Sequence, residues 1–199
     1  MKKLAVLFII AGVVLLSIGG YQYIKTIAAE KNALDEAKEL LSKDSANSDS
    51  DQASKESPET FFPGMGDTVG ILEIPAIDAE LPIVEGTDPD DLEKGVGHYK
   101  GSAYPMQQDQ IVLSGHRDTV FRKLGDVKVG DTFVVKLPYG DFTYEMVDHK
   151  IVDADDTSII KSTAPNEELV ITTCYPFSYV GNAPERYIIY AKPVVEEKS

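Results

Sequence analysis

The sequence ELVITTC at residues 168–174 decides how the rest of the chain is interpreted, because it ends on the only cysteine, Cys174. Its apolar and β-branched residues indicate a mostly buried strand. The next ten residues, YPFSYVGNAP, contain two prolines, a Gly-Asn pair and three aromatic residues, which is typical of a loop. A second strand-like run begins at Arg186. We therefore expect a thiol at the end of one strand to face a guanidinium at the start of the next.

A histidine follows another apolar run, in the sequence IVLSGHRDT at residues 111–119. A lone cysteine with a histidine elsewhere in the chain is a candidate nucleophile with its proton partner. Each residue also has a more ordinary interpretation, since free cysteines pack well in cores and histidines are often structural or exposed. Both Cys174 and His116, however, end apolar runs beside turn residues, where a rigid scaffold commonly presents reactive groups. Their combination favours a catalytic pair.

These segments resemble the sortase family, and within it the class D sortases, from about residue 70 to residue 191. The sequence VITTC, which ends at Cys174, is similar to the family signature Thr-Leu-x-Thr-Cys, with Val170 for threonine and Ile171 for leucine. The sequence GHRDT around His116 resembles the histidine segment, and Arg186 falls where the sortase arginine would lie. Three further segments resemble the first strands of that fold: GILEIP at 70–75, LPIVEG at 81–86 and GVGHY at 95–99.

The resemblance implies a cysteine transpeptidase. Cys174 would attack the carbonyl carbon of a threonine-containing peptide bond and form a thioester. His116 would stabilise the thiolate and donate a proton to the leaving amine, and Arg186 would bind the oxyanion or orient the peptide. The implied partners are secreted proteins with a C-terminal Leu-Pro-x-Thr-type signal, in class D often followed by alanine, and an amine of a peptidoglycan precursor. Peptide hydrolysis would be the side reaction.

An apolar groove is expected to receive the leucine and proline of that signal. The loop at 175–184 is the natural candidate for one wall, with Phe177 and Tyr179 as contacts. Thr173 is expected to bind substrate beside Cys174.

Three further residues near these motifs are expected to have other roles. Arg117 adjoins His116, but the alternation of side chains along a strand would direct it away, so it ranks below Arg186. His98 is expected to be structural, and His149, which follows an aspartate in a charged run, to lie on the surface.

The part of the chain after residue 63 consists of short apolar runs separated by turn residues. This pattern indicates a mainly β protein, a sandwich or a barrel. The resemblance implies the closed, eight-stranded, sortase-type β-barrel with short helices. The sequence PYGD at 138–141 predicts a hairpin turn, and DPDDLEKG at 88–95 predicts a short capped helix that ends at its glycine.

The N-terminus carries a candidate membrane helix. Lys2 and Lys3 precede an uncharged run from Leu4 to Ile24, which at about 1.5 Å per residue can cross a hydrocarbon core of about 30 Å. A cleavable secretory signal has a similar composition, but its apolar core is usually only about 7–15 residues long. We therefore expect an uncleaved anchor, with a cytoplasmic N-terminus set by the paired lysines.

This anchor defines the expected organisation of the chain. Residues 1–27 are interpreted as the membrane anchor, 28–63 as an extracytoplasmic linker or stalk, and 64–199 as the sortase catalytic β-barrel domain. Residues 28–42 have helical spacing, whereas 43–60 are almost entirely polar and are expected to be disordered. The protein is thus expected at the cell membrane, with its catalytic domain at a Gram-positive-type cell surface.

The net charge of −14 and the absence of clustered basic residues argue against a nucleic-acid partner. Two acidic clusters, at 88–91 and 153–156, could attract Ca²⁺, but they lack the spacing of an EF-hand loop. One cysteine and three scattered histidines form no zinc motif, and a single cysteine allows no internal disulfide. We therefore expect no cofactor and no metal site, with Ca²⁺ modulation left open.

Two other functions remain compatible with the residues themselves. A cysteine hydrolase would cut peptides and be indifferent to an added amine, although no Asn or Asp stands in a recognisable motif to orient the histidine. A membrane-tethered binding module would contain an inert barrel with Cys174 buried in it. Alkylation of the native protein distinguishes the last case, because a core thiol would react only on unfolding.

Overall fold

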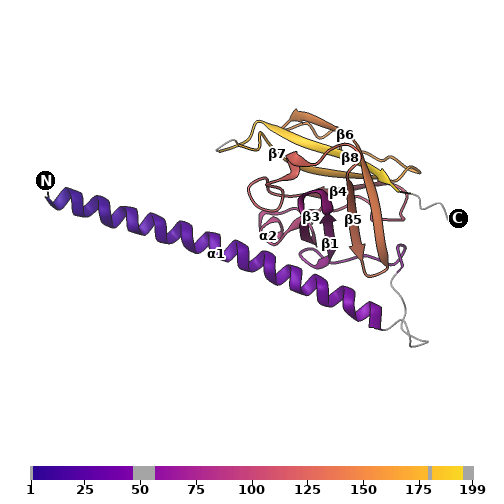
Figure 1. The fold of residues 1–199 in the computed structure, drawn as a ribbon, viewed down its shortest axis with the longest axis horizontal. Coiled ribbons are helices and arrows are strands. Elements are labelled where there is room, and N and C mark those ends of the chain that lie inside the picture. Colours follow the sequence, from indigo (N-terminus) through magenta and orange to yellow (C-terminus); the bar gives the residue numbers. More distant parts are fainter. Residues whose placement is uncertain (1, 47–56, 179–180, 195–199) are drawn as a thin grey trace.

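The computed structural model describes residues 2–46, 57–178 and 181–194. A long helix, α1 (Lys2–Ala46), lies beside a β-barrel, and the N-terminal half of the helix extends away from it (Figure 1). The short helices are α2 (Pro89–Leu92) and two 3₁₀ turns, η2 (Pro75–Ile77) and η3 (Leu124–Asp126). The predicted capped helix at 88–95 is thus shorter than expected, and the Asp91 carboxylate accepts a hydrogen bond from the backbone N–H of Asp88 at its start.

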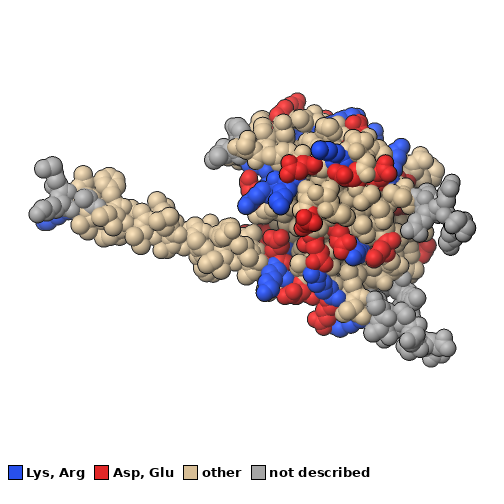
Figure 2. Space-filling model, in the orientation of Figure 1, with Lys and Arg blue, Asp and Glu red and all other residues tan. Residues whose placement is uncertain are grey.

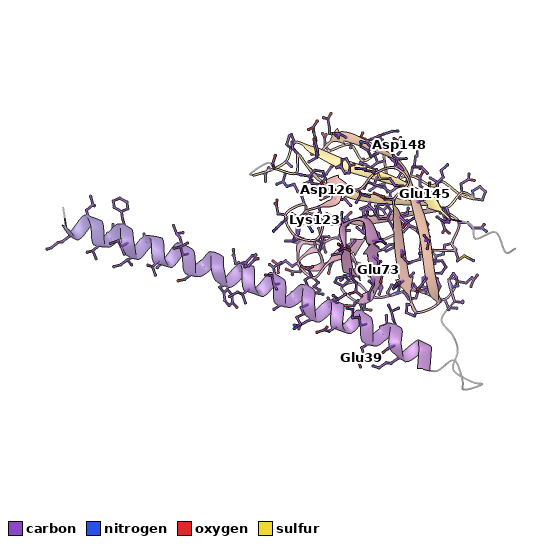
Figure 3. All side chains as sticks on the ribbon, viewed as in Figure 1. Glu39, Glu73, Lys123, Asp126, Glu145 and Asp148 are labelled. Carbon is purple, nitrogen blue, oxygen red and sulfur yellow. The ribbon has the colours of Figure 1, made fainter. Side chains whose placement is uncertain are left out.

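Eight strands form a closed barrel in the order β1-β2-β3-β4-β7-β8-β6-β5, which confirms the expected architecture. Their bounds are β1 (Thr68–Ile74), β2 (Ala79–Glu85), β3 (Val96–His98), β4 (Gln110–Ser114), β5 (Thr132–Leu137), β6 (Gly140–Asp153), β7 (Glu168–Tyr175) and β8 (Glu185–Pro193). The hairpin between β5 and β6 closes at the pair Leu137 and Gly140, as the turn residues predict. Outside the barrel, Glu73 of β1 pairs with Lys136 of β5 (Figure 3 labels Glu73).

The pairing of β4 with β7 is parallel, whereas β7 and β8 are antiparallel. Strands β5 and β6 lie between β4 and β7 in the sequence but on the other side of β8 in the barrel. Because parallel strands run in the same direction, the C-terminal ends of β4 and β7 meet at the same end of the barrel.

The burial of β7 explains its unbroken apolar sequence. Leu169 and Ile171 point into the barrel core, while Val170 packs outside with Val112 of β4 and Ile188 of β8. The outer cluster is covered by the side chains of Val152, Ile159 and Tyr190. A strand buried on both faces carries a continuous apolar run, whereas β5, buried on one face, alternates.

The second half of α1 is docked on the barrel against β1 and β2. Ala33 is buried and Ala37 is fully buried, with 0% of its surface exposed. Around them Glu36 accepts a hydrogen bond from Thr68, and Lys38 pairs with Glu80 at 2.6 Å. Small residues at i and i+4 thus let the helix approach the strands closely, and polar residues on either side fix its position.

The first half of α1 exposes a continuous apolar surface, which includes Leu7, Phe8, Leu15 and Leu16. Among the described residues, α1 is the one helix long and apolar enough to cross a membrane. The helix continues without a break from the predicted anchor into residues 28–46 of the predicted stalk. Residues 43–46, which were expected to be disordered, are thus helical. Residues 57–60 form a turn, and the rest of the polar stretch, 47–56, lies outside the described residues. The division into anchor, stalk and domain therefore stays a prediction.

The docking of α1 predicts the effect of Ala37→Arg. A long charged side chain has no room at a fully buried position, and overpacking of this kind costs about 1–3 kcal/mol. We expect the second half of α1 to detach, and trypsin to cut at Lys38 roughly tenfold faster, because 1.4 kcal/mol corresponds to a factor of ten. The melting temperature of the barrel should change little, since its core lies elsewhere.

Ala28→Arg is the matched control, because Ala28 is an exposed alanine of the same helix. Equal cleavage rates for the two variants and the wild type, measured in detergent on the full-length protein, would show that the helix is not held by this contact.

Candidate active site

The turn after β4 lies against the end of β7. In the parallel register Ser114 is opposite Thr172, and the backbone N–H of Gly115 donates to the Thr172 carbonyl at 3.2 Å. His116 follows directly, so the pairing carries it to the end of β7, where Cys174 lies. The two residues, 58 positions apart in sequence, are thus brought to one end of the barrel by adjacent parallel strands.

Cys174 is a free cysteine with a half-buried side chain. It lies directly opposite Arg186 in the antiparallel pairing of β7 with β8, as the sequence predicts. Residues directly opposite in such a pair project their side chains to the same face. The half-buried guanidinium of Arg186 donates from Nη1 to the carbonyls of Ala183 at 3.3 Å and Glu185 at 3.0 Å. The start of β8 therefore presents a positive group beside the thiol.

His116 lies in an exposed turn. Its own carbonyl accepts hydrogen bonds from the backbone N–H groups of Thr119 and Phe121, which fold the turn back on itself. The preceding Gly115 is required there, because a Cβ at this position would come within 2.5 Å of the fully buried Phe121 ring. The chain continues from this turn into η3, where Figure 3 labels Lys123 and Asp126. The imidazole is thus held on a packed turn, with its ring open to solvent.

Thr173, the predicted substrate contact beside Cys174, is a buried residue of β7. Its side chain is only 3% exposed, and its hydroxyl donates to the Gly115 carbonyl at 2.7 Å. The alternation of β7 turns Thr173 inward, because its neighbour Cys174 faces the open side. Thr173 therefore supports the turn that carries His116.

Phe177 belongs to a cluster of aromatic side chains next to Cys174. Its ring packs edge-on to Tyr175 at 5.7 Å and to Tyr187 of β8 at 5.3 Å, and it approaches Gly125 closely. Burial, and next the phenol of Tyr175, raises the pKa of Tyr187. The half-buried rings of Tyr175 and Phe177 thus pack on the buried Tyr187, which lies opposite Thr173 in the pairing of β7 with β8. Tyr179, the other predicted contact, lies outside the described residues.

Strand alternation was expected to direct Arg117 away from its neighbour His116, but both residues follow β4, which ends at Ser114, and so lie outside a strand. The Arg117 side chain is buried, and Nη1 donates to the Pro176 carbonyl at 2.8 Å. Sequence analysis missed this contact because 59 residues separate its partners and the turn geometry is not visible in the sequence.

His98 is structural, as expected. It is 1% exposed, and Nδ1 lies 2.6 Å from the Glu85 carboxylate, while Nε2 faces the Ala103 carbonyl and the Ser102 hydroxyl at 3.0 Å. The Tyr104 hydroxyl donates to the same Glu85 oxygen at 2.6 Å, and its ring stacks on the imidazole. All polar groups are used within the network. His149 is exposed, as predicted, 5.3 Å from the Tyr187 ring centroid.

Burial alone would raise the pKa of Glu85, but the hydrogen bonds from His98 and Tyr104 outweigh it and hold that pKa below its usual value of 4.5. Burial, followed by the bond to Glu85, raises the pKa of Tyr104. The network therefore contains a carboxylate that stays ionised inside the barrel wall.

Charged side chains of both signs are interspersed over the visible face of the barrel, with no continuous positive stripe (Figure 2). Among residues 2–46, 57–178 and 181–194, no group of three or more histidine, cysteine, aspartate or glutamate side chains is arranged to hold a metal ion. In the two acidic clusters, the Asp91 carboxylate accepts from the backbone N–H of Asp88 at the start of α2, and Asp156 accepts from the backbone N–H of Ser158 in a turn.

Known proteins share both the sequence and the fold. The family description "Sortase domain" matches residues 72–194. Sortase D of Bacillus subtilis (strain 168) is 57% identical over 199 residues, which cover 98% of this chain and 100% of that protein. The structure of a Clostridium perfringens sortase D5 transpeptidase has a TM-score of 0.70 and 25% identity, over 84% of this chain and 99% of that one. Sortase C from Clostridium perfringens SM101 has a TM-score of 0.61 and 26% identity, over 90% and 98% of the two chains.

The network around Glu85 predicts a pH-dependent effect of Tyr104→Phe. Because the folded-state pKa of Glu85 is lowered, its stabilisation is present above pH 4.5 and is lost as the pH falls through the folded-state value. Removal of the hydroxyl should lower the free energy of unfolding by about 1–3 kcal/mol at pH 7. The loss should be smaller at pH 3.5, where Glu85 is becoming protonated in the unfolded chain. Urea unfolding of the wild type and of Tyr104→Phe at pH 7 and pH 3.5 measures this loss in the free energy of unfolding.

Tyr99→Phe, at an exposed tyrosine of the neighbouring segment, is the matched control. A loss for Tyr104→Phe of the same size at pH 7 and pH 3.5 would contradict the role of the ionised Glu85.

Proposed function

The chain belongs to the sortase family, the cysteine transpeptidases, and we propose that it joins secreted proteins with a C-terminal Leu-Pro-x-Thr-type signal to a peptidoglycan amine. The observation that carries this proposal is the position of the free thiol of Cys174. It lies directly opposite Arg186 and at the end of the strand that pairs with the His116 segment. These are the three groups that acyl transfer requires: a nucleophile, a proton carrier and a donor for the oxyanion.

In the proposed first step, the Cys174 thiolate attacks the carbonyl carbon of the threonyl peptide bond. The C–N bond breaks, and the leaving amine takes a proton from the His116 imidazolium, which leaves a thioester on Cys174. In the second step the acceptor amine attacks the thioester carbonyl and gives a proton to His116, and Cys174 leaves as the thiolate. No net oxidation or cofactor is needed. Water in place of the amine gives hydrolysis.

Arg186 is proposed to stabilise the oxyanion that forms in both steps. A guanidinium has five N–H donors, and among the described residues its bonds are those of Nη1 to the carbonyls of Ala183 and Glu185. These two bonds orient the planar group, and we propose that its other donors bind the substrate. Because Arg186 is half-buried opposite Cys174, such bonds would be stronger than at a fully exposed site.

The apolar end of the signal is proposed to bind along the half-buried rings of Tyr175 and Phe177, which pack on the buried Tyr187. Flat aromatic faces suit the side chains of leucine and proline, which have no hydrogen-bonding groups to satisfy. Tyr179 is proposed to extend this surface from the adjoining loop. An alanine after the threonine, as the class D resemblance implies, would itself carry the leaving amine on a small residue.

The α1 helix is proposed to anchor the enzyme in the membrane with the N-terminus in the cytoplasm and the barrel outside the cell. Lys2 and Lys3 support this orientation, because basic residues are enriched on the cytoplasmic side. Since the second half of α1 is docked on β1 and β2, the barrel would be held close to the end of the membrane span. Clients that are themselves exported across the same membrane would meet the enzyme there.

We predict that Cys174→Ala abolishes peptide cleavage and transfer while the melting temperature stays close to that of the wild type. Arg186→Ala should lower kcat by roughly 10²–10³, the usual cost of one oxyanion donor, with Arg186→Lys in between because lysine lacks the planar fork. His116→Ala should lower kcat by about 10²–10⁴, the usual contribution of a general acid. The assay follows a Leu-Pro-x-Thr-type peptide by chromatography.

The product distribution separates transfer from simple hydrolysis. With the wild-type protein, a soluble amine such as diaminopimelate should convert the hydrolysis product into an amide-linked product. Cleavage that proceeds with no amine-linked product would support the cysteine hydrolase, and an active Cys174→Ala variant would contradict the assignment of the nucleophile.

A further inference from the structure

Two hydrogen bonds flank the pair formed by His116 and Cys174. On one side, the carbonyl of Gly115, just before His116, accepts from the hydroxyl of Thr173, just before Cys174, at 2.7 Å. On the other side, Arg117, just after His116, donates from Nη1 to the carbonyl of Pro176, two residues after Cys174, at 2.8 Å. Both segments are therefore tied together before and after the reactive residue.

The Arg117 guanidinium is held firmly in this position. Its side chain is only 6% exposed, and Nε and Nη2 lie 3.3 and 3.4 Å from the two carboxylate oxygens of Asp118. The carboxylate is largely in solvent, where it balances the buried positive charge without being desolvated itself. A planar group fixed along one edge by a carboxylate has little freedom, so Nη1 keeps its direction toward Pro176.

The contact falls where the β ladder ends. The last pair between β7 and β8 is Tyr175 with Glu185, so Pro176 is the first residue beyond it. Proline has no N–H, and its carbonyl is the one backbone polar group with which this residue can be held. The hydrogen bond from Arg117 to this carbonyl therefore links the segment after β7 to the turn after β4.

We propose that Arg117 is a positioning residue, which holds the segment after Cys174 against the turn that carries His116 and so sets the separation of thiol and imidazole. This inference rests on the proposed function of the two residues. Within the described part of the chain, no hydrogen bond joins His116 to Cys174 directly, so their geometry depends on the bonds that flank them. Arg117 has no direct part in the chemistry, because its side chain is only 6% exposed and its Nε, Nη1 and Nη2 bond to Asp118 and Pro176.

A positioning role predicts a particular kinetic effect. A misplacement of about 1 Å between reacting groups can cost 10²-fold in rate, so Arg117→Ala should lower kcat roughly 10- to 100-fold. KM should change less than kcat, because the contacts of the Phe177 ring with Tyr187 and Gly125 still hold the aromatic cluster in place. Arg117→Lys should recover part of kcat, since its ammonium can still donate to the Pro176 carbonyl. Added guanidinium ion should likewise raise kcat of Arg117→Ala.

Arg122→Ala is the matched control. Arg122 lies in the same turn, is exposed, and donates to the Asp118 carbonyl without reaching the segment after Cys174. We expect wild-type kcat in this variant and no response to guanidinium. All measurements use the full-length protein in detergent, with a Leu-Pro-x-Thr-type peptide, a soluble amine, and a melting curve for each variant.

The outcomes separate this inference from the proposed function. If the wild type forms no amide-linked product, the proposed function fails, whatever Arg117 does. If the wild type is active and Arg117→Ala matches it in kcat and KM, the positioning role is overturned. Should Arg117→Ala fail to fold, Arg117→Lys and Asp118→Asn provide the test. A fall in kcat at an unchanged melting temperature supports the inference, and wild-type kcat in both contradicts it.

Discussion

The parallel pairing of β4 with β7 is the constraint on which the rest of the structure depends. An antiparallel pairing would place the end of β4 and the end of β7 at opposite ends of the barrel, and His116 would lie a full strand length from Cys174. The parallel arrangement requires a long connection, which the chain makes with β5 and β6 on the far side of β8. In the closed barrel, β4 and β7 therefore end on the same side, although they are distant in sequence. Strand β8 places Arg186 at that same end, opposite Cys174.

Polar contacts at this edge complement the apolar packing of the strands. Leu169 and Ile171 hold β7 in the core, but they fix only the strand and leave the segments beyond it undetermined. The bonds from Thr173 to Gly115 and from Arg117 to Pro176 continue the connection past the ladder. A similar arrangement stabilises the neighbouring β2 and β3, where the buried Glu85, His98 and Tyr104 satisfy one another. The backbone segments around the site are therefore held by these buried hydrogen bonds, whereas the side chains of His116, Cys174 and Arg186 remain accessible to a substrate.

Much of this arrangement could be predicted from the sequence, and the exceptions share a physical reason. The continuous apolar run of β7, the hairpin before Arg186 and the turn before His116 are local patterns, and the structure confirms each. The inward position of Thr173, the Arg117 contact and the docking of α1 through Ala37 are long-range contacts. They depend on how separate segments meet, and nothing within a short window of sequence carries that information. The closed barrel itself came from resemblance to a family, because periodicity alone left a sandwich and a barrel equally open.

The central claim, that Cys174 is an acylated nucleophile, is tested most directly by intact-mass spectrometry. The full-length protein in detergent would be mixed with a Leu-Pro-x-Thr-type peptide, quenched in acid and digested to locate any adduct. The account predicts an added mass equal to the acyl part of the peptide, located on the fragment with Cys174 and lost faster when an amine is present. Absence of that adduct, together with a native thiol that resists alkylation, would contradict the account and indicate an inert barrel.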